Sequence, residues 1–280
     1  MCDETTTKDA KAYLRRSGAL TRRQFGEVSM GAGLAMLLPR AANAQAVTES
    51  EIDVTTPDGV SDSYFVHPSS GSHPGVLIWP DAFGLRPAKR QMAKRLAESG
   101  YAVLVVNQYY RSLRAPIVNT TNFAEVSDTL RPLMGTLNPE TQVRDARAFI
   151  GFLDRQQAVD SNRKMGTMGY CMGGPFTMRT AASLPDRVGA AASFHGGGLV
   201  TDQPDSPHLL VPQMQAQYLL RLLPTMMRVN RKRRTYFAMH FRRLGYRLRL
   251  RSMRGPCTGG VLRILRCTMS RRPNAPGVAC

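Results

Sequence analysis

The chain has 280 residues, enough for one sizeable α/β domain or two small ones, and its 42% apolar fraction is ordinary for a globular protein. Its formal net charge of +18 is unusual, but all 20 acidic residues precede position 221, and 16 of the 38 basic residues lie within residues 221–280. This distribution excludes a uniformly basic domain. It divides the chain into a balanced body, residues 45–220, and a basic tail, residues 221–280.

Cysteine usage indicates no disulfide framework. Cys171 is the one cysteine of the body, and a single thiol cannot form a disulfide within its own domain. No stretch reaches the roughly 18 continuous apolar residues that a membrane-spanning helix needs. No metal-ligand constellation or dinucleotide fingerprint is present in the sequence, so we expect no cofactor and no metal.

Residues 1–44 have the pattern of an export signal. Arg22 and Arg23 precede a mild apolar run, which ends near the small-residue site Ala42-Asn43-Ala44. A basic region, a short apolar region and an A-x-A site are typical of a secretory signal peptide, and the paired arginines resemble a twin-arginine signal. We therefore expect Arg22 and Arg23 to engage a bacterial export machinery, which would deliver a periplasmic or secreted protein. An amphipathic leader or a disordered N-terminus is the alternative.

The body alternates predicted strands and helices. Short apolar runs predict strands at Ile52–Val66 (with a turn at Pro57-Asp58-Gly59), Gly75–Trp79, Tyr101–Asn107, Lys164–Tyr170, Val188–Phe194 and from Gln217 onward. Apolar stripes and caps predict helices at Pro87–Ser99, from Asn138-Pro139-Glu140 onward and at Met172–Leu184, with a loop-rich stretch before Asn138. The alternation predicts an α/β fold with a mostly parallel sheet, helices on both faces and a site at the carboxyl ends of the strands.

The run Gly169-Tyr170-Cys171-Met172-Gly173 joins a predicted strand to a predicted helix. Its G-x-C-x-G spacing is that of a nucleophile elbow, with cysteine in place of the usual serine. The positive end of the following helix would favour the thiolate, which is the nucleophilic form. Cys171 is therefore the candidate nucleophile, and a buried structural cysteine at a glycine-rich turn is the alternative.

Three motifs, Gly169–Gly174, Trp79–Leu85 and Phe194–Gly197, resemble the dienelactone hydrolase family of α/β-hydrolases. The resemblance extends from about Ile52 to Leu220. It implies hydrolysis of a small lactone or carboxylic ester by a Cys–His–Asp triad through an acyl-enzyme. We expect a monomer that binds this small molecule and no nucleic acid.

The resemblance also implies further site residues. Asp81 follows an early strand where the family has an acid, usually glutamate, and is a candidate accessory acid; a cap or loop carboxylate is the alternative. The backbone N–H groups of Ala82 and Met172 would form the oxyanion hole. Arg111 follows a strand on the same side and is a candidate for binding a substrate carboxylate, with an exposed surface arginine as the alternative.

The triad partners of Cys171 are not found. In α/β-hydrolases the acid and then the histidine follow the nucleophile, and the family's aspartate would fall just past Leu220. The tail contains no Asp or Glu, and its single histidine, His240, lacks the family's flanking glycines. The triad Asp and His are therefore unknown, and we expect this chain to have impaired turnover.

Three hypotheses account for this absence. The arginine-rich tail has the composition of a reading-frame-shift product, which predicts that the C-terminal strands of the sheet are lost or disordered and that the body is marginally stable. Alternatively, the protein is non-enzymatic and the tail binds polyanions or an anionic membrane. In the third, the site is rewired and uses His195, at a strand end, or His208, in a polar loop, with Asp202 or Asp205.

Overall fold

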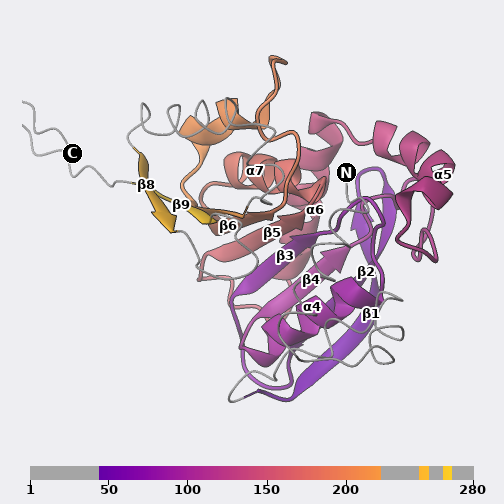
Figure 1. Cartoon of the computed structure of the whole chain (residues 1–280). Coiled ribbons are helices and arrows are strands. Elements are labelled where there is room, and N and C mark those ends of the chain that lie inside the picture. The colour runs from indigo at the N-terminus through magenta and orange to yellow at the C-terminus, as the bar shows by residue number, and fades with distance from the viewer. Residues whose placement is uncertain (1–43, 222–245, 252–260, 267–280) are drawn as a thin grey trace, which may run out of the picture.

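The computed structural model describes residues 44–221, 246–251 and 261–266, which build one nine-stranded sheet (Figure 1). The predicted signal peptide lies almost wholly outside these residues. The strands are β1 (Val47–Thr56), β2 (Gly59–Pro68), β3 (Gly75–Trp79), β4 (Ala102–Val106), β5 (Met165–Tyr170), β6 (Val188–Phe194), β7 (Gln217–Arg221), β8 (Tyr246–Arg251) and β9 (Val261–Arg266). The helices are α4 (Pro87–Glu98), α5 (Phe123–Gly135), α6 (Pro139–Asp154), α7 (Gly173–Ser183) and the 3₁₀ helix η1 (Pro207–Gln213).

The centre of the sheet is parallel, as predicted. The strand order is β1-β2-β4-β3-β5-β6-β7-β9-β8, and the run from β4 to β7 is parallel throughout. Every residue of β3 and β4 is buried, which is why these strands are continuous apolar runs. Because parallel strands end at the same edge, the residues that follow β3, β5 and β6 lie near one another.

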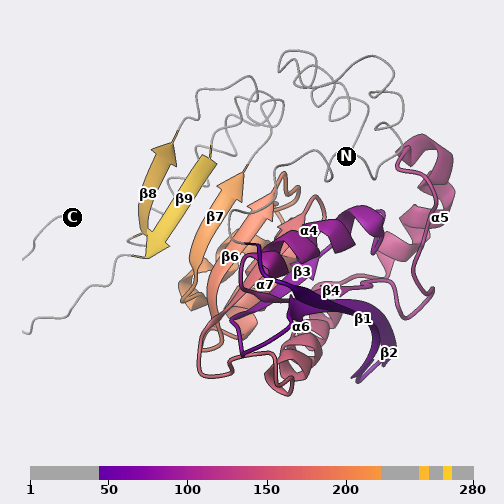
Figure 2. The same ribbon diagram turned by 90° about the horizontal axis from the view of Figure 1, so that it is seen from below.

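Helices cover both faces of the sheet (Figure 2). On one face, α4 packs Ala93 and Ala97 against buried residues of β2 and β4. On the other face, α6 and α7 enclose Trp79, whose ring meets Phe149 and Phe176 edge-on at centroid distances of 5.8 and 5.4 Å. The predicted α/β architecture is therefore confirmed. Among the residues described, no helix combines the length and apolarity needed to cross a bilayer.

The loop-rich stretch predicted before Asn138 also contains a helix that the sequence did not predict, because α5 occupies Phe123–Gly135. Asn122 caps this helix by accepting a hydrogen bond from the Ala124 N–H at 3.2 Å, and Leu130 and Leu133 are buried. Pro132 lies inside the helix, close to its end. A proline within a sparse apolar pattern is an ordinary sign of a break, so packing decides here where local propensity does not.

Two segments of the tail continue the sheet. β9 pairs antiparallel with β7, and β8 pairs antiparallel with β9. The β8 sequence alternates leucine with arginine, a period of two that favours a strand with one apolar face. The expected loss of all strands after β7 is therefore wrong for these two segments, while the remainder of the tail lies outside the described residues.

Candidate active site

The turn between β5 and α7 has the geometry of a strained elbow. Cys171 adopts a left-handed backbone conformation with φ of +53°, and its N–H donates to the Phe194 carbonyl at 3.0 Å. A non-glycine residue in this region is costly unless its surroundings hold it there. Gly169 shows how tight the turn is, because a Cβ on it would lie 2.0 Å from the Gly173 carbonyl oxygen. The predicted strand–turn–helix around Cys171 is present.

The elbow also presses against the end of β3. A Cβ on Gly173 would lie 2.5 Å from the Trp79 carbonyl oxygen, so the start of α7 touches the chain just before the Ala82 loop. Tyr109 bridges the two segments, with its hydroxyl 3.0 Å from the Ala82 carbonyl oxygen and 3.3 Å from the Met172 Sδ. The loop and the elbow are thereby held together at the carboxyl edge of the sheet.

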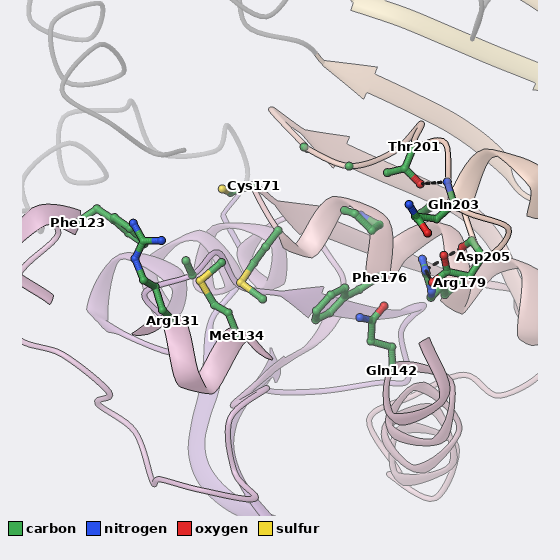
Figure 3. A pocket seen from close by; sticks show the side chains of 16 residues that line it. Phe123, Arg131, Met134, Gln142, Cys171, Phe176, Arg179, Thr201, Gln203 and Asp205 are labelled. Carbon is green, nitrogen blue, oxygen red and sulfur yellow. Dashed lines mark hydrogen bonds and ion pairs between the residues drawn. The ribbon is translucent and has the colours of Figure 1, made fainter. Parts of the chain in front are cut away.

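Cys171 opens into a pocket of about 820 Å³ (Figure 3). Ala82 and Met172 line it beside Cys171. Within the part of the chain that the structure describes, neither the Ala82 N–H nor the Met172 N–H donates a hydrogen bond. Two such backbone donors beside a nucleophile are what an oxyanion hole requires. The opposite wall comes from α5, through Phe123, Arg131 and Met134, which the sequence interpretation missed along with the helix.

Asp81 is a buried, fully engaged carboxylate. Arg86 binds it through two contacts of 2.6 and 2.8 Å, and the Lys89 ammonium lies 3.0 Å away. Burial alone would raise the pKa of the Asp81 carboxyl, but the positive charges of Lys89 and Arg86 hold that pKa well below its usual value. The carboxylate also accepts the Phe83 N–H at 3.1 Å. At neutral pH this charged group is suited to fixing the loop that carries Ala82 rather than to exchanging protons.

Lys89 links Asp81 to the residues around the elbow. Its side chain is only 3% exposed, and its ammonium lies 3.8 Å from the centre of the Tyr170 ring. The His195 ring centroid lies 6.3 Å from that of Tyr170. No sequence pattern pointed to Lys89, since a lysine on a helix ordinarily faces solvent.

Of the residues in the rewired-site hypothesis, His195 is the one that lies beside the elbow. It follows Phe194, the residue that accepts the Cys171 N–H, and it has a left-handed φ of +46°. Burial lowers the pKa of His195 to about 4; the positive charge of Lys89 acts in the same direction and Asp81 opposes it. The imidazole is therefore neutral at physiological pH, the form that can accept a proton.

The other residues of the rewired-site hypothesis are scattered. His208 is 4% exposed within η1, and its Nδ1 lies 2.7 Å from the Ser206 hydroxyl, so its predicted position in a polar loop is wrong. Asp202 is exposed. Asp205 lines the pocket but pairs with Arg179 at 3.4 Å. His208 is buried because η1 packs back on α7, which no local sequence pattern shows.

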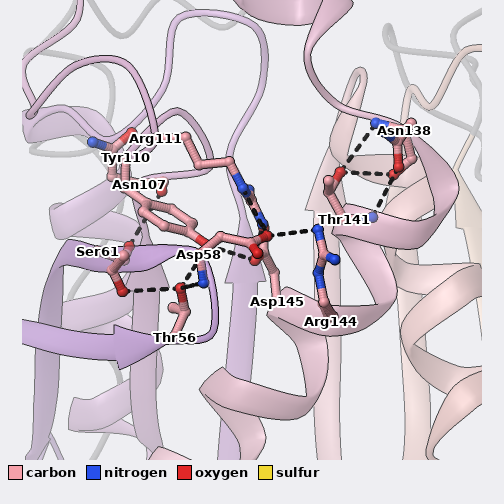
Figure 4. Close-up of polar contacts among 11 residues, drawn as sticks. Thr56, Asp58, Ser61, Asn107, Tyr110, Arg111, Asn138, Thr141, Arg144 and Asp145 are labelled. Atoms are coloured by element: carbon pink, nitrogen blue, oxygen red, sulfur yellow. Dashed lines mark hydrogen bonds and ion pairs between the residues drawn. The ribbon is translucent and has the colours of Figure 1, made fainter.

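Arg111 lies in an ion-pair network apart from the pocket lining (Figure 4). Its guanidinium contacts both oxygens of Asp145, at 2.7 and 2.9 Å, and its Nε donates to Asp58 at 3.0 Å. These contacts join the β1–β2 turn to α6. With its side chain 17% exposed and its donors engaged, Arg111 matches neither the predicted carboxylate-binding residue nor an exposed surface arginine.

Replacing His195 by asparagine is expected to make the free energy of unfolding less dependent on pH between about pH 6.5 and pH 4. Because the folded-state pKa of His195 lies below its unfolded value, the histidine's contribution is complete above pH 6.5 and is lost as the pH falls toward 4. Asparagine tolerates the left-handed backbone and does not titrate. Urea unfolding of both proteins across this pH range measures the effect. The prediction is contradicted if the free energy of unfolding changes with pH to the same extent in both proteins.

Among the described residues, no group of three His, Cys, Asp or Glu side chains is placed to hold a metal ion. The donors at this edge of the sheet are instead one thiol, one neutral imidazole and one paired carboxylate. A thiol held on a strained turn, facing a pocket and two unengaged backbone N–H groups, suits covalent attack on a carbonyl carbon.

Comparison with known proteins places this geometry in a family. A carboxymethylenebutenolidase of Rhodococcus opacus is 29% identical over 130 residues, 45% of this chain and 46% of that protein. The carboxymethylenebutenolidase of Pseudomonas putida is 25% identical over 147 residues, 52% of this chain and 60% of that protein. The chain thus spans about half the length of these relatives.

Solved structures of other proteins share the fold of this chain. A dienelactone hydrolase-like promiscuous phosphotriesterase from metagenomic libraries superposes with a TM-score of 0.57 at 26% identity, covering 71% of this chain and 77% of that one. The dienelactone hydrolase of Anabaena variabilis shares the fold, with a TM-score of 0.52 at 20% identity over 69% of this chain and 81% of that one. The sequence profile of the dienelactone hydrolase family matches residues 61–221, more than half of the chain. The chain therefore belongs to the dienelactone hydrolase family.

Proposed function

We propose that Cys171 attacks the carbonyl carbon of a small carboxylic ester or lactone and becomes acylated. The observation that carries this proposal is the strained Cys171 at the start of α7, facing a pocket with the Ala82 and Met172 N–H groups unengaged. The helix N-terminus stabilises the negative charge of the thiolate. Relatives named carboxymethylenebutenolidases support an ester or lactone as the substrate.

The acylation step needs only chemical groups that belong to residues 45–220, the body of the chain. The thiol loses its proton to solvent, the sulfur forms a bond to the carbonyl carbon, and the carbonyl oxygen becomes an oxyanion that accepts the N–H groups of Ala82 and Met172. Collapse of this intermediate breaks the C–O bond and releases the alcohol portion as its anion, or as an alcohol after it takes a proton from water. A good leaving group makes this step independent of a general acid.

Hydrolysis of the acyl-enzyme is the step that needs a base. Water must lose a proton as it attacks the thioester, a task that the triad histidine performs in this class of enzyme. His195, neutral and beside the elbow, is the described residue best placed to assist. The sequence has no Asp or Glu after β7 that could complete the family's triad, so deacylation is expected to be slow and acylated Cys171 to accumulate during turnover.

Incubation of the full chain with p-nitrophenyl acetate tests the proposal. We expect a burst of about one equivalent of p-nitrophenol and one acetyl group on the intact protein, mapped to Cys171 by peptide mass spectrometry. Replacing Cys171 by alanine should remove both signals. Replacing the four remaining cysteines by serine should leave both signals intact. A folded protein that acquires no acetyl group on Cys171 would exclude this mechanism.

A further inference from the structure

Arginines of the tail gather on one face of the sheet. Figure 2 shows β7, β9 and β8 side by side, and β9 pairs antiparallel with both neighbours. Residues that pair directly across neighbouring strands lie on the same face of a sheet. Arg249 pairs with Arg263, which pairs in turn with Leu219. The basic residues on this face, named here the arginine face, are Arg221, Arg247, Arg249, Arg251 and Arg263, and the aliphatic ones are Leu219, Val261 and Leu265.

The opposite face of the same three strands continues the core. Tyr218 and Leu220 of β7 are buried, and the Tyr218 hydroxyl forms a hydrogen bond with Thr177 of α7. The residues aligned with these two on β9 and β8 are Ile264, Leu262, Leu248 and Leu250. The period of two therefore separates an apolar face on the α7 side of the sheet from a basic face on the other side.

The arginine face belongs to the side of the sheet that α4 covers at its other end. One row of paired residues crosses the strands in the order Ile78, Met168, Ala192, Leu219, Arg263 and Arg249. Ile78 and Met168 belong to the apolar cluster that α4 closes. On β6 and β7, Ala190 and Gln217 are exposed and Leu219 is partly exposed. The cover of α4 thus ends before β6, and the sheet is open to solvent where the arginine face begins.

The positive charges of the arginine face are closely spaced. Neighbouring strands lie about 4.8 Å apart, and successive residues on one face of a strand lie about 6.7 Å apart. The five arginines therefore lie within an area of about 10 by 14 Å. The sequences of β7, β8 and β9 contain no Asp or Glu, and neither does the rest of the tail. Because these spacings are comparable to the Debye length of about 8 Å at physiological salt, the charges act together on a partner that carries several negative charges.

The residues between the arginines favour a membrane over a nucleic acid. Leu219, Val261 and Leu265 lie on the same face, and arginines mixed with aliphatic residues suit the boundary between headgroups and acyl chains of an anionic bilayer. Proteins that bind nucleic acid without sequence preference commonly stack the bases on aromatic side chains. The aromatic residues of these three strands are Tyr218 and Tyr246, and both lie on the opposite face.

We propose that the arginine face binds the surface of a membrane that contains anionic phospholipids. The guanidinium groups pair with headgroup phosphates, and the flat sheet allows all five to reach one bilayer surface. The site is separate from the pocket, because the described lining of the pocket includes no residue of β7, β8 or β9. The inference therefore goes beyond the proposed function and holds whether or not Cys171 is acylated.

Cosedimentation of the full chain with lipid vesicles tests the proposal. Vesicles of phosphatidylcholine with about 30% phosphatidylglycerol should bind the chain at least about 10-fold more tightly than vesicles of phosphatidylcholine alone. Raising the NaCl concentration from about 0.1 M to about 0.5 M should weaken this binding, because salt screens the charges. Equal binding to the two kinds of vesicle would overturn the proposal.

Replacing three neighbouring arginines locates the binding surface. The triple variant Arg247→Gln, Arg249→Gln and Arg263→Gln should bind the anionic vesicles about 100-fold more weakly, since each basic residue at such a surface contributes about fivefold. Circular dichroism and thermal unfolding show whether the triple variant is folded. If it is not, Arg249→Gln alone decides, with an expected loss of about fivefold, and undiminished binding would contradict the proposal.

A matched control removes the same charge from another part of the tail. Lys232, Arg233 and Arg234 lie outside the described residues, and replacing all three by glutamine should weaken vesicle binding by less than about 10-fold. A loss as large as that of the triple variant on the sheet would show that the charge of the tail alone drives binding, and would overturn the arginine face. Tighter binding to a DNA duplex of about 30 base pairs than to the anionic vesicles, at the same salt, would overturn the choice of a membrane.

Discussion

Replacing Gly169 by alanine is expected to prevent the domain from folding stably. The added Cβ would lie 2.0 Å from the oxygen and 2.4 Å from the carbon of the Gly173 carbonyl. Both atoms belong to the backbone of the turn, so relief requires the elbow itself to open and α7 to move away from β5. We expect a loss of at least about 4–5 kcal/mol, the upper end for single substitutions, against a total stability of about 5–15 kcal/mol.

Thermal and urea unfolding monitored by circular dichroism measure this effect. Gly135→Ala and Gly197→Ala are matched controls, because a Cβ at either position meets no atom within 4 Å. Gly135 closes α5, where alanine should be neutral or stabilise by up to about 1 kcal/mol. If Gly169→Ala unfolded together with these controls, the tight turn that holds Cys171 would be refuted.

Much of the fold follows from local patterns. The continuous apolar runs of β3 and β4 predict buried parallel strands, and both strands lie at the centre of the sheet. Asn138 and Pro139 predict the start of α6, where the Asn138 side chain accepts the Thr141 N–H at 2.9 Å in a capping box. The G-x-C-x-G spacing around Cys171 predicts the elbow. Each of these signals lies within a few residues, so tertiary packing reinforces it rather than overrides it.

The partners of charged residues could not be predicted in the same way. Arg111 meets Asp58 and Asp145 because the β1–β2 turn packs beside α6, a contact between segments far apart in the sequence. Lys89 is buried because its ammonium pairs with Asp81, which follows β3. Exposure of an arginine or lysine depends on such long-range pairs, which composition and spacing do not specify.

Asp81→Asn is expected to lower the free energy of unfolding by about 3–5 kcal/mol, because it leaves Lys89 and Arg86 enclosed without their counter-charge. The Lys89 side chain is 3% exposed and that of Arg86 is 17% exposed, so water compensates little of the loss for Lys89. Urea unfolding at pH 7 measures the change. Asp53→Asn is the control, because the Asp53–Arg114 pair is more than half exposed on each side and should contribute less than about 1 kcal/mol.

The pH dependence of unfolding provides a second test of the Asp81–Lys89 pair. The pKa of Asp81 lies below its unfolded value, so its contribution to stability is complete above about pH 4–5 and is lost as the pH falls through the folded-state pKa. The wild type should therefore lose more stability than Asp81→Asn on acidification. Adding Lys89→Met to Asp81→Asn removes the stranded ammonium, so the double variant should be more stable than the sum of the single losses predicts. Strict additivity would mean that Asp81 and Lys89 do not stabilise each other.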